Sequence, residues 1–320
     1  MIRYILQRLA ILIPILIAVA VLIFTLMYFV PGDPASIALG GSYATQADID
    51  AARELMGLNR PYIVRLGEYM GNLLFRFDFG NSLTYGSPVR QELMKRFPYT
   101  LKIALGCILF SIILGVPLGV RAAVKANTLE DRMSMFLSLI GLSIPGFWLA
   151  LLLVLFFALQ LGWLPSSGAR DWRYFILPVL ANGIDDVAGI ARQTRASMLE
   201  VIRSDYVTTG RSKGLSERAV IYGHALPNAL IPTITFCGNR FGRMLGGTMI
   251  IEVIFSIPGI GTYMINGINA RDYNVVQGCI IYIALTFSII MLITDIIYAY
   301  VDPRIKAQYV KEKKRVPAAA

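Results

Sequence analysis

Long apolar runs constrain this chain more than any other feature of its sequence. Six runs are each about twenty residues long, a length that crosses a hydrocarbon core of about 30 Å at about 1.5 Å per helical residue. The chain is 56% hydrophobic and 16% charged, outside the range of soluble globular domains. We therefore predict an all-α polytopic membrane protein with spans at residues 9–30, 99–123, 133–161, 175–191, 231–254 and 276–300.

The positive charges predict how these spans are oriented. The sequence carries 30 Lys and Arg against 20 Asp and Glu, and the excess lies beside the spans, which favours a topological role over nucleic-acid binding. Segments 1–8, 121–133, 192–230 and 302–320 hold 17 of the 30 basic residues. By the positive-inside rule these segments, and therefore both termini, are cytoplasmic. The first run is too long for a signal peptide and no cleavage site follows it, so it is expected to remain as a span.

The same pattern divides the chain into parts. Residues 1–30 form a short cytoplasmic stub and the first span, residues 31–98 an extracytoplasmic helical segment, residues 99–302 a five-helix core, and residues 303–320 a basic cytoplasmic tail. The tail is expected to be held by the anionic membrane surface.

The extracytoplasmic segment is polar, with nearly balanced charge, and is expected to contain helices at 45–56, 61–75 and 88–97. Thr45 and Asp48 have the spacing of a capping box at the start of the first of these helices.

The longest polar interruption in the second half of the chain covers residues 191–232. Apolar residues at helical spacing up to Tyr206 predict that the preceding helix leaves the membrane and ends at Gly214, because glycine takes a left-handed conformation without penalty. Ser216 is a good N-cap for a second short helix, 217–225, which Leu226-Pro227 would end. A short helix in this place buries nothing in its own chain, so we expect it to dock a partner.

The spacing of Gly214, His224 and Leu226-Pro227 resembles the EAA loop of ABC importer permeases. The acidic head of that motif is absent, because residues 208–210 read Thr-Thr-Gly. This departure is typical of the dipeptide/oligopeptide branch, which the loop fragments SMLEV, DY, KGL and HAL resemble closely. The fragments IRYILQRL, PGDP, FSIPGIG and RDY elsewhere in the chain resemble the same branch.

The resemblance covers residues 1–306, although Asn274 replaces a proline that is usual in the family. It implies a type I ABC importer permease in the cell inner membrane, with six transmembrane helices and a helical insertion after the first. It also implies a second homologous permease subunit, two ATP-binding subunits and an extracytoplasmic substrate-binding protein. Peptides are the expected solutes, with nickel complexes, glutathione, opines and oligosaccharides as alternatives within the branch.

The chain has no G-x-x-x-x-G-K-[ST] phosphate-binding loop. It is therefore expected to hydrolyse no ATP itself. The resemblance implies that it forms half of the translocation pathway and that ATP and Mg²⁺ bind to the partner ATPase subunits. The resemblance places the ATPase dock in a coupling loop within residues 192–230, with Gly214 shaping the bend and Leu215, Val220 and Tyr222 offering packing.

The residues assigned to this docking loop are Asp205, Tyr206, Arg211, Lys213, Gly214, Leu215, Glu217, Arg218, His224, Leu226 and Pro227. His224 is the only histidine, and the three cysteines have no paired spacing. No catalytic site and no metal site are therefore expected.

Five charged residues fall inside predicted spans: Asp185, Asp186, Arg240, Arg243 and Glu252. Ionised groups there are costly unless they pair or face water, so each is a candidate functional residue. Arg240 and Arg243 share one helical face. Two hypotheses stay open: the arginines form a structural ion pair with Asp185 or Asp186, or these side chains line the passage and touch a charged solute.

Gly242, Gly246 and Gly247 in the fifth predicted span allow close helix approach, either within this chain or between two permease subunits. The competing functional class is an ion-coupled secondary transporter or a channel that uses the intramembrane charges for coupling. Such transporters often contain inverted repeats, which we do not find in this sequence. A non-transporting scaffold would leave the charges unexplained.

Overall fold

The computed structural model of the 320-residue chain describes residues 2–40 and 44–301, with side chains from residue 8 onward. The predicted basic tail, 303–320, lies outside the described residues. The described part of the chain is helical, and its only β pairing is an isolated bridge between Asn81 and Pro88. The all-α prediction is therefore confirmed.

Among the described residues, four helices are long and apolar enough to cross a membrane: α1 (Ile2–Phe29), α5 (Val89–Val124), α8 (Ile176–Ile202) and α14 (Tyr273–Val301). A fifth candidate is a bent pair that meets at 93°. Its arms are α6 (Leu129–Ser143) and α7 (Gly146–Leu153) with the π-helical extension Val154–Gln160. The span predicted over residues 133–161 therefore corresponds to this bent pair, whose bend the hydropathy did not predict. Ile144, between the two helices, is extended because it precedes Pro145, and a residue in that position is disfavoured in a helix.

The predicted span at 231–254 corresponds to α11 (Leu226–Gly247) followed by α12 (Met249–Ile254). With 22 residues α11 is long enough to span a membrane, but unlike the four long helices it is not apolar enough to count as a candidate span. It carries Arg240 and Arg243, which lower its hydropathy. The remaining helices of this half are α9 (Asp205–Ser212), α10 (Glu217–Ala219), the π-helical turn Val220–Ala225, and α13 (Ile260–Asn269).

The segment after α1 folds into α2 (Pro34–Ala38), α3 (Gln46–Leu55) and α4 (Tyr62–Gly71). The predicted capping box is confirmed: Thr45 accepts a hydrogen bond from the Asp48 N–H, and Asp48 accepts one from the Thr45 N–H.

The helix expected at residues 88–97 is not separate, because α5 continues through Pro98. Its first turns are held by packing, since Val89 and Leu93 are fully buried in a cluster shared with α13 and α14. That packing outweighs the single backbone hydrogen bond that a proline removes.

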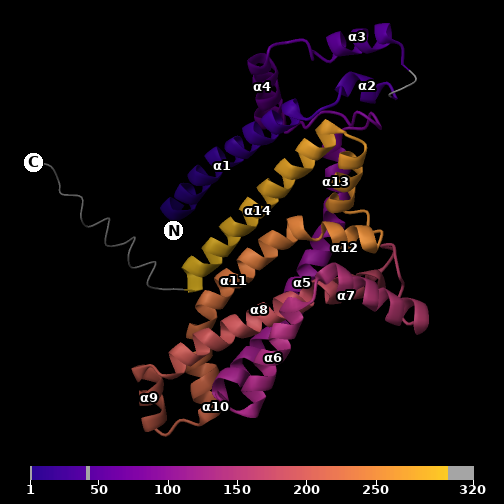
Figure 1. Ribbon diagram of the computed structural model, residues 1–320. Helices are drawn as coiled ribbons and strands as arrows, with labels where there is room; N and C mark the ends of the chain where they lie inside the picture. The colour runs from indigo at the N-terminus through magenta and orange to yellow at the C-terminus, as the bar shows by residue number, and fades with distance from the viewer. Residues whose placement is uncertain (1, 41–43, 302–320) are drawn as a thin grey trace, which may run out of the picture.

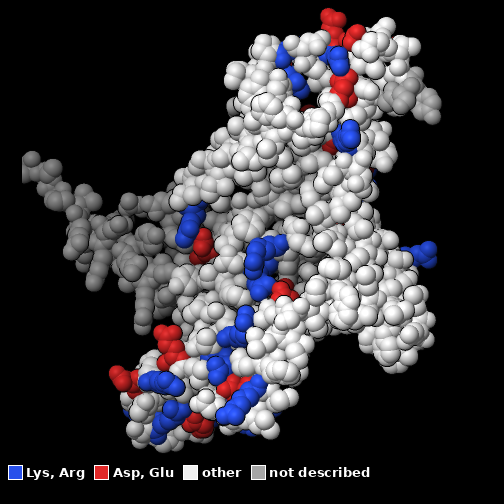
Figure 2. Space-filling view, viewed as in Figure 1, with Lys and Arg blue, Asp and Glu red and all other residues white. Residues whose placement is uncertain are grey.

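The helices run between two opposite ends of the molecule (Figure 1). The segment α2–α4 lies at one end and the α9–α10 pair at the other, while α1 and α14 pack side by side between them. α5 and α8 form the most extensive helix pair. Figure 2 shows charged side chains gathered at the two ends, with an intervening band that is almost free of charge apart from a few isolated groups and one cluster near its centre. Such a band matches the hydrocarbon region of a membrane.

Candidate functional site

The connection from α8 into the 205–227 loop contains a break that periodicity did not predict. The prediction of one helix reaching Gly214 is wrong, because α8 ends at Ile202 and α9 begins only at Asp205. Ser204, between them, is extended, with φ −74° and ψ 153°, and its hydroxyl donates to the Val201 carbonyl at 2.6 Å. The side chain thus offers the backbone an alternative to a continued helix.

The turn between α9 and α10 is built as predicted. Gly214 has φ +79°, and no heavy atom lies within 4 Å of the position that a Cβ would occupy. Backbone conformation rather than space therefore selects glycine here. Ser216 caps α10 by accepting a hydrogen bond from the Ala219 N–H at 3.3 Å.

An ion pair closes this turn. Arg211 donates through Nε and Nη2 to both carboxylate oxygens of Glu217, at 3.1 and 2.7 Å. These hydrogen bonds hold the pKa of the Glu217 carboxyl below its ordinary value and raise the pKa of Arg211. Both groups are exposed, so the pair orders the turn more than it stabilises the fold.

The prediction that Leu226-Pro227 ends the second helix is wrong. α10 passes through the π-helical turn directly into α11, which has proline in its first turn. The loss of one backbone hydrogen bond at Pro227 is outweighed by the packing of this turn against α5 and α8. The 205–227 loop is therefore joined to α11 without a flexible connection.

The loop also has a core of its own, contrary to the expectation that it buries nothing. Val207, Val220, Ile221 and Ala225 are buried and pack against residues of α5 and α8. Val220, which was expected to offer packing to a partner, is fully buried within the chain. Of the other loop residues predicted as a docking surface, Leu226 is half-buried. The exposed ones are Asp205, Tyr206, Arg211, Lys213, Gly214, Leu215, Glu217, Arg218, His224 and Pro227.

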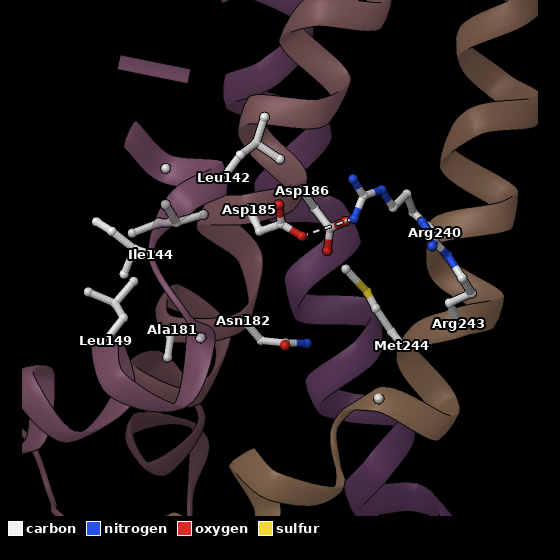
Figure 3. Close-up of a pocket in the computed structure, with 14 residues that line it drawn as sticks. Leu142, Ile144, Leu149, Ala181, Asn182, Asp185, Asp186, Arg240, Arg243 and Met244 are labelled. Atoms are coloured by element: carbon white, nitrogen blue, oxygen red, sulfur yellow. Dashed lines mark hydrogen bonds and ion pairs between the residues drawn. The ribbon is translucent and has the colours of Figure 1, made fainter. Parts of the chain in front are cut away.

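Four of the five intramembrane charges meet at a cavity of about 350 Å³ between α8, α11 and the bend of α6 and α7. Figure 3 shows Asp185 and Asp186 on one side and Arg240 and Arg243 on the facing helix. Arg240 Nη1 lies 3.0 Å from Asp185 Oδ2 and 3.0 Å from Asp186 Oδ1. The cavity therefore fits both hypotheses, because it contains an ion pair and is also lined by charged side chains.

The members of this cluster differ in exposure. The side chain of Asp186 is 6% exposed and that of Arg240 18%, whereas that of Asp185 is 44% exposed. The Arg240 guanidinium also lies over the Phe236 ring, 5.3 Å from its centroid. Arg243 is exposed, and within the described ranges it forms no ion pair or hydrogen bond.

Sequence reasoning missed one polar residue of the cavity. Asn182 lines it together with Asp185 and Asp186, and its amide nitrogen lies 3.8 Å from the Cys107 sulfur. The available signal was its position three residues before Asp185 in the same apolar run, which places both side chains on one face of α8.

The structure does not bring Glu252 into this cavity. Glu252 is fully buried and accepts hydrogen bonds from the Thr100 hydroxyl at 2.7 Å, the Thr248 hydroxyl at 3.0 Å and the Thr262 N–H at 3.0 Å. A Cβ on Gly259 would overlap the carboxylate. Glu252 thus ties α5, α12 and the first turn of α13 together, where the partial positive charge of the helix N-terminus favours a carboxylate.

A second polar network, at the end of the molecule formed by α2–α4, was also missed. Asp272 is fully buried and accepts from the Ser82 hydroxyl at 2.6 Å and the Thr84 N–H at 3.2 Å. Asn274 donates from its side chain to the Asn81 carbonyl at 2.7 Å. A proline at that position could not make this bond, so the departure from the family pattern adds a contact between α14 and the 80–88 segment.

The comparisons with known proteins agree on one family. The model described as "Binding-protein-dependent transport system inner membrane component" matches residues 115–307, and its N-terminal counterpart matches residues 1–104. The dipeptide transport system permease protein DppB of Alkalihalophilus pseudofirmus is 41% identical, with 96% of this chain and 100% of the relative covered. The glutathione transport system permease protein GsiC of Escherichia coli K12 is 39% identical, with 96% and 99% covered.

Among solved structures, an inward-facing MetNI methionine ABC transporter matches with a TM-score of 0.56 over 67% of this chain and 97% of that chain. The sequences are 18% identical, so this likeness concerns the fold.

Proposed function

This chain belongs to the family of binding-protein-dependent transport system inner membrane components, and we propose that it forms half of the passage of an ABC importer for short peptides and docks an ATPase subunit through its 205–227 loop. It is a multi-pass permease subunit and not itself an enzyme. Permeases of this family work with ATPase and binding-protein partners.

The observation that carries the docking proposal is the construction of the loop. Its inner face is buried against α5 and α8, so the loop moves with the helices and not independently of them. Its outer face leaves large apolar side chains unpartnered, with Tyr206 47%, Leu215 43% and Tyr222 55% exposed. Rigid attachment and an apolar outer face are what a groove on an ATPase subunit requires.

The rest of the assembly follows from this role. Two ATPase subunits would hold ATP and Mg²⁺, a second homologous permease would complete the passage, and an extracytoplasmic binding protein would deliver the solute. The two relatives are named for dipeptide and glutathione transport, which supports a short peptide as the solute here. The Asp185, Asp186, Arg240 and Arg243 cavity is the part of the passage that this chain supplies, and both termini would be cytoplasmic.

The test is a pull-down from gently solubilised membranes, with the co-purifying chains identified by mass. Wild type should retain ATPase subunits and a second permease. Gly214→Pro should lose the ATPases and keep the second permease, because proline cannot adopt φ +79°.

The matched control is Gly162→Pro, which places proline at φ +64° in the turn that follows the π-helical segment Val154–Gln160, also with no neighbour within 4 Å. It should retain the ATPases. If folded wild-type chain is recovered without any ATPase, this result would contradict the ABC importer proposal. It would favour an ion-coupled transporter in which the intramembrane charges bind the coupling ion.

A further inference from the structure

The four charges at the cavity separate into a fixed pair and two available groups. Arg240 and Asp186 are both largely buried and lie 3.0 Å apart, so their charges neutralise each other. The hydrogen bond of Arg240 Nη1 goes to Asp185 Oδ2 and holds Asp185 beside this pair. A Cβ on Gly189 would lie 2.9 Å from Arg240 Nη2, which shows how closely the guanidinium is held against α8. What remains accessible is one cation, Arg243, and one carboxylate, Asp185.

Arg243 is the available cation. It lies one turn from Arg240 on the same face of α11, lines the cavity, and has no ion-pair partner in the described part of the chain. A guanidinium at membrane depth is costly unless it faces water or a counter-ion. The side of the cavity formed by Arg243 therefore favours a carboxylate.

Asp185 is the available anion. Arg240 contacts only its Oδ2, at 3.0 Å, and 44% of the side chain remains exposed. A charge-assisted hydrogen bond from an ammonium group to its other oxygen is open. Because the four formal charges sum to zero, the cavity favours a molecule that carries both signs over a net cation or a net anion.

On the basis of the proposed function, we propose that this cavity is a binding site for a short zwitterionic peptide, with the peptide carboxylate on Arg243 and its α-ammonium on Asp185. The fixed Arg240–Asp186 pair positions Asp185. Leu142, Ile144, Leu149 and Met244 line the remainder and provide apolar surface for the peptide side chains, to which a flexible methionine adapts. A volume of about 350 Å³ is at the lower end for ligand pockets, which suits a peptide of two or three residues.

The test measures binding to the assembled transporter without its binding protein, so that the selectivity of that protein does not enter. The permease pair with its ATPases is placed in nanodiscs and studied by saturation-transfer NMR. The probes are alanyl-alanine, its C-terminal amide and its N-acetyl form. Wild type should bind alanyl-alanine about tenfold more tightly than either capped peptide, since each cap removes one charge-assisted hydrogen bond.

Two variants identify which residue binds the carboxylate end of the peptide and which binds the ammonium end. Arg243→Gln should abolish discrimination against the amide and keep discrimination against the N-acetyl peptide, and Asp185→Asn should do the reverse. Arg173→Gln removes an exposed arginine outside the cavity and should change neither ratio. A purely structural role of either residue would weaken all three probes together and leave the ratios unchanged.

The inference is overturned if the three probes bind with equal affinity or do not bind at all. It is also overturned if the two variants leave the affinity ratios between the probes unchanged. A parallel measurement keeps this outcome separate from the proposed function. Vesicles that contain the transporter, supplied with the binding protein and ATP, import dipeptide if the proposed function holds, whatever the NMR result. If they import none, the proposed function itself fails.

Discussion

At the residue scale, polar side chains within the helical bundle are of two kinds. Most are satisfied by partners of the same chain. Arg195, for example, donates to both carboxylate oxygens of the buried Asp131 at 2.6 and 2.7 Å, and Glu252 is surrounded by neutral donors. Arg243 is of the second kind, a charged group exposed to a cavity without a partner in the described chain. The first kind fixes the fold, and the second is available for a ligand.

The contact between α11 and α14 gives a prediction about a single methyl group. A Cβ on Gly238 would overlap the side chain of Thr294, whose own Cβ is only 2.7 Å away. Thr294 cannot turn aside freely, because its hydroxyl donates to the Ile290 carbonyl at 2.8 Å. We expect Gly238→Ala to destabilise the protein by about 1–3 kcal/mol, measured as the unfolding midpoint in SDS titrations of the purified permease.

Gly247→Ala is the control, because nothing lies within 4 Å of a Cβ at that position of the same helix. It should leave the midpoint unchanged or raise it slightly, since alanine favours the helix. Equal midpoints for the two variants would show that α11 and α14 do not pack as closely as described.

The charged residues could be found from the sequence, and so could the pairing of Arg240 with Asp185 and Asp186, which was one of the two hypotheses, but the neutral partners of Glu252 could not. Asp185, Asp186, Arg240, Arg243 and Glu252 stand out because charges are rare in apolar runs. The partners of Glu252 are hydroxyls and a backbone N–H, groups that occur throughout the chain and carry no signal in the sequence. The glycines singled out in the sequence likewise indicated only part of the contact between α11 and α14. A Cβ on Gly242 would lie 2.9 Å from the Phe287 ring, but the closest approach of the two helices is at Gly238, which was not one of them.

At the element scale, apolar periodicity predicted where the helices lie and missed where they bend. Hydropathy is a property of composition and is the same on both sides of a bend. The α6–α7 turn, the break at Ser204 and the continuous passage through Pro227 all depend on local backbone conformation. Where a residue type is favoured by a special backbone position, as glycine is at the left-handed Gly214 and threonine is at the Thr45 cap, the prediction is confirmed.

The α9–α10 turn gives a pH prediction. The folded-state pKa of Glu217 is lowered by Arg211, so the pair stabilises the turn above the unfolded value of about 4.3, and this stabilisation is lost as pH falls through the folded pKa. The contribution of this pair to ATPase binding should therefore be constant between pH 7 and about 5.5 and weaken only below about 4.3. Arg211→Gln should move the acid midpoint of ATPase release upward, by less than about one pH unit because the pair is exposed.

The measurement is the amount of ATPase subunit that stays on immobilised permease between pH 7 and 4. Arg203→Gln removes an exposed arginine of the same segment without touching the Arg211–Glu217 pair, and its midpoint should equal that of wild type. Acid denaturation of the ATPase affects all three samples alike, so only a difference in midpoint between variants reports on the pair. An Arg211→Gln midpoint equal to wild type would contradict the prediction.

At the scale of the whole molecule, one segment connects the candidate dock to the candidate passage. The loop follows α8, which carries Asp185 and Asp186, and leads without interruption into α11, which carries Arg240 and Arg243. A displacement of the loop therefore acts on both helices that form the ion pair. Under the proposed function, this arrangement would link ATPase closure at one end of the molecule to the separation of charged groups at the cavity.

The same arrangement requires that the two ends of the molecule face different compartments. Tyr85 lies in the segment between α4 and α5 and is 72% exposed, and Glu130 begins α6 near the opposite end with a side chain that is 62% exposed. The three natural cysteines are buried and give a low background. A membrane-impermeant maleimide should therefore label Tyr85→Cys in intact spheroplasts and Glu130→Cys only in inverted vesicles.

The substitutions themselves are mild, because Tyr85 makes no side-chain hydrogen bond in the described structure and Glu130 only an exposed ion pair with Lys125. Detergent-solubilised samples of both variants should react fully and serve as the control for accessibility. The reverse pattern would invert the orientation that the positive charges predict. Labelling of both positions from one side would place the insertion and the loop side of the bundle in the same compartment, and a chain so arranged could not form half of a passage across the membrane.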